Sequence, residues 1–165
     1  MKDPAEIARA YFLDERHEFG CAEVTFVVLK GAFGLDDPMD SAAAMALNGG
    51  VAYGGGVCGA VTGAALALGL LAQARIDDHA RAKKVARELT ARLMDGFTDE
   101  HGAVSCRDLI GIDLRAPGGH AAFIASGLWR DRCMRQIETV VRDAAPLADP
   151  DAWEMALRDL DAPGA

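Results

Sequence analysis

Four cysteines are the residues of this chain with the most distinctive chemistry, and they are far apart in the sequence. They lie 37, 48 and 27 positions apart, at Cys21, Cys58, Cys106 and Cys133. Thiolates exchange with disulfides, and they ligate zinc and iron–sulfur clusters. No two of them form a Cys-x-x-Cys pair, so there is no local metal knuckle and no thioredoxin-type motif. Any shared site must therefore be assembled from four different elements by tertiary folding.

Cys58 follows three glycines and opens a run of small apolar residues, GGGVCGAVTGAALALGLL. The run predicts a helix over about residues 57–73 with Cys58 at or near its N-terminus. Because free N–H groups and the helix dipole favour a thiolate there, the position can lower the pKa of the thiol. The alternative is that Cys58 is an inert, buried residue that only fills space, which is common for free cysteines.

The other three cysteines lie in two kinds of setting. Cys21 and Cys133 fall on apolar helical stripes and are predicted to point inward, and Cys106 stands where a loop enters a short helix. Three arginines near Cys133 suit either thiolate stabilisation or a solvated face beside a buried thiol, and we favour the solvated face. These arginines are Arg130, Arg132 and Arg135.

Histidines and carboxylates add no recognisable catalytic or metal-binding pattern. No histidine has a ligand partner four positions away, and we interpret all four as surface residues: His17, His79, His101 and His120. Glu18, Glu23 and Asp108 lie near cysteines, and an acid or base role for one of them stays open. No Ser-His-Asp signature is present.

A glycine motif formally matches a dinucleotide fingerprint but has the wrong context. Gly54-x-Gly56-x-x-Gly59 requires a preceding strand, whereas SAAAMALNGGVAY before it is helix-like. No Lys-Ser/Thr pair follows, so a P-loop is excluded too. We instead expect Gly59, Gly63 and Ala67, at i, i+4 and i+8, to form a face on which another helix packs closely.

The elements that must position these residues are helical throughout. The sequence predicts an all-α, single-domain bundle of about six helices plus a short C-terminal helix, over residues 1–165. The expected long helices are 4–18, 21–33, about 38–48, 57–73, 78–97 and 120–144, with short helices at 106–110 and 151–160.

Composition narrows the class of protein further. The 165 residues are 51% apolar but only 6% aromatic, and the net charge of −8 would repel phosphate backbones, so a nucleic-acid partner is not expected. The N-terminus has no apolar signal-peptide core, which makes the cytoplasm the default compartment. Residues 41–74 carry no charge, but eight glycines interrupt them, so we expect buried helices and no membrane span.

Three blocks together resemble a known family over about residues 19–144. They are Cys21-Ala22, Cys58-Gly59-Ala60-Val61-Thr62-Gly63 and Cys106-Arg107-Asp108-Leu109-Ile110-Gly111, followed by Cys133 in the C-terminal helical region. This order is similar to that of the C_GCAxxG_C_C family of redox-active four-cysteine proteins. The resemblance implies a small, helical, bacterial and cytoplasmic protein whose site is made of Cys21, Cys58, Cys106 and Cys133.

The leading hypothesis is a redox protein that uses these four cysteines as a thiol–disulfide centre or as ligands of an iron–sulfur electron-transfer cluster. The alternatives are a metal-binding or sensing module with zinc on four thiolates, and a non-catalytic helical interaction protein whose cysteines only pack. The sequence does not decide whether the protein is an enzyme, how the cysteines pair or what the redox partner is. A homodimer formed through the Gly/Ala face is plausible.

Overall fold

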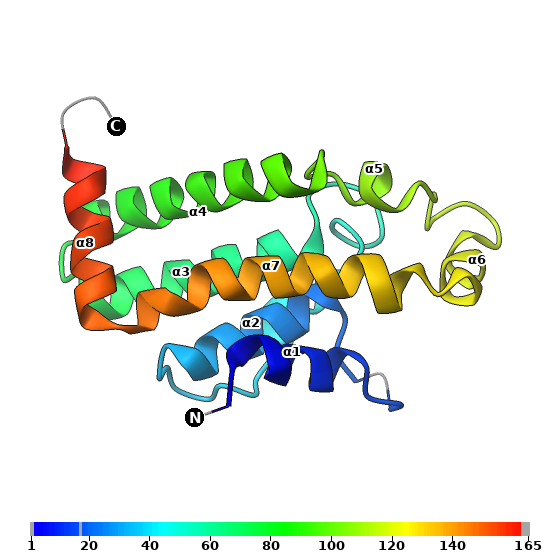
Figure 1. Ribbon diagram of the computed structural model, residues 1–165, viewed down its shortest axis with the longest axis horizontal. Helices are drawn as coiled ribbons and strands as arrows, with labels where there is room; N and C mark the ends of the chain where they lie inside the picture. The colour runs from blue at the N-terminus through cyan, green and yellow to red at the C-terminus, as the bar shows by residue number, and fades with distance from the viewer. Residues whose placement is uncertain (1, 17, 163–165) are drawn as a thin grey trace.

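The computed structural model describes residues 2–16 and 18–162, and its fold is all-α, as predicted (Figure 1). In the described residues the elements are α1 (Pro4–Phe12), α2 (Cys21–Ala32), η1 (Ala42–Leu47), α3 (Gly59–Arg75), α4 (His79–His101), α5 (Cys106–Ile110), α6 (Gly119–Ser126), η2 (Trp129–Cys133), α7 (Met134–Ala144), η3 (Ala145–Ala148) and α8 (Pro150–Asp161). The 3-10 helices are η1 and η3, and η2 is a π-helix.

Helices α2, α3 and α7 form the centre of the molecule. Helix α3 packs against α2 on one side and α4 on the other, and α7 contacts α1, α2, α3 and α4. Helix α2 is buried nearly all round, even at its polar residues Glu23, Thr25 and Lys30. Their polar groups are satisfied: Lys30 Nζ, for example, donates to the backbone oxygens of Asp37 and Asp40, both at 2.7 Å.

The predicted small-residue face of α3 is the surface that meets α2. A Cβ added to Gly63 would overlap the backbone oxygen of Ala22, and one added to Gly59 would overlap the sulfur of Cys21. Ala67, one turn further along, is fully buried. The absence of side chains at the two glycines therefore sets the short separation between α2 and α3.

Several predicted helix boundaries were wrong. Helix α1 ends at Phe12 rather than near residue 18, because Asp14 forms a turn in which its carboxylate accepts the backbone N–H of Arg16 at 2.9 Å. The expected third helix is only a 3-10 segment, η1. The expected long helix 120–144 is broken at Gly127, whose φ of 71° ends α6, and it resumes through η2 into α7.

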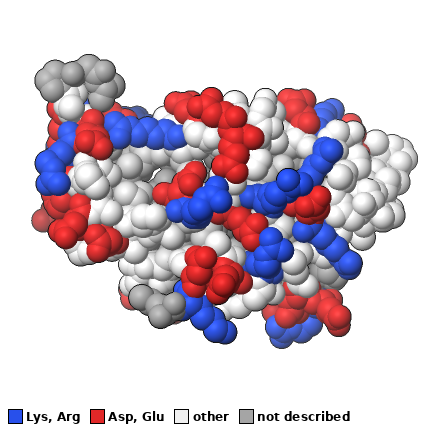
Figure 2. Space-filling view, in the orientation of Figure 1, with Lys and Arg blue, Asp and Glu red and all other residues white. Residues whose placement is uncertain are grey.

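The two ends of the molecule differ in character. Figure 1 shows α8 lying across one end and α5 and α6 at the opposite end. Figure 2 shows acidic and basic side chains mixed over most of the visible face but absent from the end where α6 lies, and α6 itself contains no charged residue. Within the described part of the chain, no helix combines the length and the apolar character needed to cross a bilayer.

Candidate functional site

Three of the four cysteines lie at the start of a helix, and the fourth lies where a π-helix continues into α7. Cys21 and Cys106 are the first residues of α2 and α5, Cys58 is the N-cap of α3, and Cys133 ends η2 just before α7. The predicted N-terminal settings of Cys58 and Cys106 are thus confirmed. Because α2, α3 and α7 pack together, their starting residues come from distant parts of the sequence to one end of the bundle.

Cys21 is the most exposed of the four and is surrounded by backbone donors. As a residue it is partly exposed, whereas the other three cysteines are buried. Backbone N–H groups of Cys21 itself, Ala22, Gly49 and Gly59 interact with its sulfur and act to lower its pKa. Its thiol also lies 3.9 Å from Asn48 Oδ1, which accepts the Ala22 N–H at 2.9 Å.

Cys58 and Cys106 are held on two antiparallel backbone segments. Cys58 N–H donates to the Val104 oxygen at 2.8 Å, and Cys106 N–H donates to the Gly56 oxygen at 2.6 Å. Between these bonds, Val57 and Ser105 form an isolated β-bridge. This pairing ties the start of α3 to the start of α5 although 48 positions separate the two cysteines.

The four thiols interact electrostatically in every pairwise combination. The pKa of Cys58 is raised by Cys21, Cys106 and Cys133, that of Cys106 by Cys21, and that of Cys133 by Cys21 and Cys106. A charge on one sulfur therefore affects each of the other three. The four thiols, which come from separate elements, are therefore near enough to influence one another's ionisation.

Burial, more than helix termini, sets the ionisation of these thiols. Desolvation is the main cause at each position: it raises the pKa of Cys21, raises those of Cys58 and Cys133 well above the usual range, and raises that of Cys106 to about 11. The idea that the N-terminus of α3 lowers the pKa of Cys58 was therefore wrong: Ala60 N–H acts in that direction, but burial outweighs it.

A left-handed turn supports the Cys21 side of this cluster. Five consecutive residues, 49–53, have positive φ, among them Val51 at 62°, Ala52 at 49° and Tyr53 at 59°. Such a run is costly for residues with a side chain, most of all for a β-branched one. Two hydrogen bonds hold this turn in place. Ala52 N–H donates to Ala46 O at 2.7 Å, and Ala52 O accepts from Arg115 Nε at 2.9 Å.

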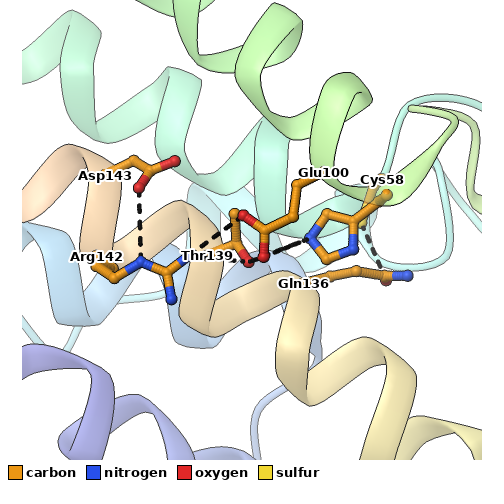
Figure 3. A network of polar contacts seen from close by, with 7 residues as sticks. Cys58, Glu100, Gln136, Thr139, Arg142 and Asp143 are labelled. Carbon is orange, nitrogen blue, oxygen red and sulfur yellow. Dashed lines mark hydrogen bonds and ion pairs between the residues drawn. The ribbon is translucent and has the colours of Figure 1, made fainter.

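A polar network lies on the Cys58 side (Figure 3). The thiol of Cys58 is 3.7 Å from Gln136 Oε1. Further along α7, the Thr139 hydroxyl donates to Glu100 at 2.9 Å and lies 3.1 Å from His101 Nε2. Since the hydroxyl proton points to Glu100, His101 donates from Nε2, and burial lowers the pKa of this histidine and favours its neutral form.

The histidine and arginine interpretations had mixed outcomes. His101 is not a surface residue, because its side chain is only 15% exposed and packs on Phe97. His79 and His120 are exposed as expected, and His17 lies outside the described residues. The three arginines near Cys133 are exposed, in agreement with the solvated-face interpretation.

Two functional neighbours of the cysteines were missed in the sequence, Asn48 and Gln136. Asn48 lies at the end of a segment that was interpreted only as helix-like. Its amide joins Cys21 and Ala22 to the buried carboxylate of Glu23, which accepts from Asn48 Nδ2 at 2.9 Å. Glu23 also accepts from Gly20 N–H and from Ser41, so its role is to order the start of α2. No local sequence signal marks Gln136, whose contact with Cys58 spans 78 positions.

All four cysteines are free thiols, and no disulfide joins them. Among residues 2–16 and 18–162, no three histidine, cysteine or acidic side chains are grouped closely enough to hold a metal ion.

Comparison with known proteins gives one match. Residues 19–147 match a family model described as "Putative redox-active protein (C_GCAxxG_C_C)". Neither the curated proteins nor the solved structures contain a significant match to this chain.

Proposed function

Since the chain belongs to the C_GCAxxG_C_C family of redox-active proteins, we propose that Cys21, Cys58, Cys106 and Cys133 act as one thiol–disulfide centre. The observation that supports this is geometric: the Cys21 sulfur lies against Gly59, next to Cys58, and backbone hydrogen bonds tie the start of α3 at Cys58 to the start of α5 at Cys106. Isolated packing cysteines have no need to meet in this way. Four thiols in mutual range can store electrons in pairs.

The proposed reaction is exchange with a disulfide of a partner molecule. One thiolate attacks the partner disulfide, which forms a mixed disulfide and releases one partner thiol. A second cysteine then attacks the mixed disulfide, so a disulfide forms within the protein and the second partner thiol is released. Two electrons and two protons pass from the cysteines to the partner, and the reverse sequence reduces the centre.

Cys21 is the thiol that we expect to attack first. It is the only one of the four that is partly exposed as a residue; burial raises the pKa of its thiol, but four backbone N–H groups act to lower it. Cys58 is its expected disulfide partner, because the Cys21 sulfur lies against Gly59 and the Cys21 charge is the strongest of the cysteine charges acting on Cys58. The exchange rate should rise with pH because the thiolate is the nucleophile.

The test equilibrates the protein in thiol–disulfide buffers of graded potential and counts free thiols by mass spectrometry after alkylation. We expect two thiols and then four to disappear reversibly, with the Cys21–Cys58 peptide pair first. A Cys21→Ser variant should slow the first step, whereas Cys133→Ser, which removes a buried thiol, should leave the rate of that step largely unchanged.

Two outcomes contradict the proposal. One is that all four thiols stay reduced and titratable even in the most oxidising buffer. The other is that anaerobically purified protein carries iron or zinc in stoichiometric amounts that four Cys→Ser substitutions remove, because the centre would then be a metal site. Visible absorbance and metal analysis of the same sample distinguish iron–sulfur from zinc.

A further inference from the structure

A polar cavity lies beside the cysteine cluster, between the end of α4, the short helix α5 and the start of α7. Its volume is about 320 Å³, and it is lined by Glu100, His101, Leu109, Arg132, Arg135 and Gln136. Gln136 forms its connection to the cluster, since the Gln136 amide oxygen meets the Cys58 thiol at 3.7 Å. None of the proposed redox steps uses this cavity.

The amide of Gln136 presents an unused donor to this cavity. The residue is only 4% exposed, and its oxygen is occupied by Cys58. Its NH₂ group has no hydrogen-bond partner among the described residues. Among the described residues, every fully buried side-chain nitrogen or oxygen has a hydrogen-bond partner. The NH₂ group therefore keeps some solvent exposure, and since Gln136 lines this open volume, the group is available to an acceptor there.

Two guanidinium groups complete a set of donors. Arg132 forms no ion pair with any described carboxylate, and its one hydrogen bond is a long one, 3.4 Å from Nη1 to the Leu109 oxygen. Among the described residues, Arg135 pairs only with Asp131, at 3.2 Å, where both side chains are more than 60% exposed. Exposed pairs of this kind contribute little energy, so Arg135 can exchange Asp131 for a ligand.

The one carboxylate in the lining is already engaged. Glu100 accepts from Thr139 at 2.9 Å and pairs with Arg142 at 3.3 Å. His101 donates from Nε2 to Thr139 and so leaves Nδ1 free of that bond. The uncommitted groups are thus two cations and one amide donor, which together match an anion with several acceptor oxygens.

We propose that this cavity binds the carboxylate of a small organic acid, held by Arg132 and Arg135 and by the NH₂ group of Gln136. A planar carboxylate suits the fork of a guanidinium group, and the volume limits the ligand to a small molecule. Because Gln136 also contacts Cys58, the ligand lies one side chain from the cysteine cluster. The binding needs no redox step and does not depend on the proposed function.

The test measures binding of glutarate, a dicarboxylate, by isothermal titration calorimetry of the reduced protein in dithiothreitol and a carboxylate-free buffer. Glutaramide, which has the same shape without charge, is the ligand control. We expect saturable binding of glutarate and at least tenfold weaker binding of glutaramide. The side-chain NH₂ resonances of Gln136 should shift on glutarate addition in a ¹H–¹⁵N NMR spectrum.

Matched arginine variants locate the site. Arg132→Gln and Arg135→Gln should each weaken glutarate binding at least tenfold. Arg130→Gln should leave it unchanged, because Arg130 is exposed on the same segment but stacks over Trp129 and does not line the cavity. Phosphate is the competing anion: if it binds and glutarate does not, the carboxylate assignment is wrong. Absence of saturable glutarate binding, or equal loss in all three variants, overturns the proposal.

Discussion

At the scale of single residues, the cysteines show how burial outweighs the helix terminus. A helix N-terminus contributes about 0.3–1 kcal/mol to a nearby charge, which is less than the 1.36 kcal/mol that corresponds to one pKa unit. Burial raises the pKa of Cys106 from 9.0 to about 11, and burial is also the largest effect at the other three positions. The resting thiols are therefore protonated near neutral pH.

This ionisation has a consequence for stability in alkali. The unfolded chain releases the Cys106 proton near pH 9, whereas the folded chain keeps it up to about pH 11. The contribution of Cys106 to the free energy of unfolding is therefore full below pH 9 and falls as the pH rises towards 11. The total loss is on the order of 2 kcal/mol. Urea denaturation of the reduced protein across this range should show the loss.

The control for that measurement is Cys106→Ala, which removes the titrating group. Its free energy of unfolding should fall less steeply with pH than that of the unsubstituted protein. Identical slopes for the two proteins would mean that Cys106 ionises as readily in the folded state as in the unfolded one, against the burial that the structure gives it.

At the scale of elements, the packing of α2 on α3 depends on two glycines without side chains. We predict that Gly63→Ala destabilises the protein by about 1–3 kcal/mol, because the new Cβ would overlap the Ala22 oxygen in the backbone of α2. Gly69→Ala is the matched control on the same helix, since a Cβ there meets no atom within 4 Å.

Chemical denaturation separates these two glycine variants. Gly69→Ala should stabilise the protein by about 0.5–1 kcal/mol, because alanine is the better helix former. If both variants shift stability in the same direction by similar amounts, α2 and α3 do not approach as closely as described.

The left-handed turn gives a second prediction at this scale. Val51 has a φ of 62° and is half exposed, so its side chain adds strain with little burial in return. Val51→Gly should therefore raise the free energy of unfolding by about 1 kcal/mol. Ala43→Gly, at an exposed residue of η1 with ordinary φ, should lower it by about 0.5–1 kcal/mol. A stability loss at both positions would argue against the turn.

At the scale of the whole molecule, oxidation of the cluster should tie distant helices together. A Cys21–Cys58 disulfide closes a loop of 37 positions. Restricting the unfolded chain in this way is worth about 4 kcal/mol in the chain-entropy account. We expect the oxidised protein to unfold at higher urea concentration than the reduced protein, and Cys21→Ser to abolish the difference. Unchanged or lower stability on oxidation would show that the native geometry resists that bond.

The net charge of the whole molecule predicts only which class of partner it does not bind. The net charge of −8 still predicts no binding to nucleic acid, and salt-dependent retention of the protein on a DNA column would contradict it. Homodimerisation and the cytoplasmic location remain predictions from the sequence.

The sequence by itself determined the helical class, the family and the position of each cysteine at or inside a helix. Apolar periodicity and glycine spacing are local properties, so close packing of another helix on Gly59 and Gly63 could be predicted from them, but only the structure identifies that helix as α2. Boundaries were less predictable, because turns such as the one at Asp14 and the stop at Gly127 depend on single side chains and φ angles that periodicity does not encode.

Only the tertiary structure decided that the four thiols interact, that burial raises their pKa values and that Asn48 and Gln136 contact them. Desolvation depends on everything packed around a group, and the contact between Cys58 and Gln136 joins residues 78 positions apart. Neither desolvation nor this long-range contact produces a periodic pattern in the sequence, because both depend on how the helices pack against one another rather than on any one helix.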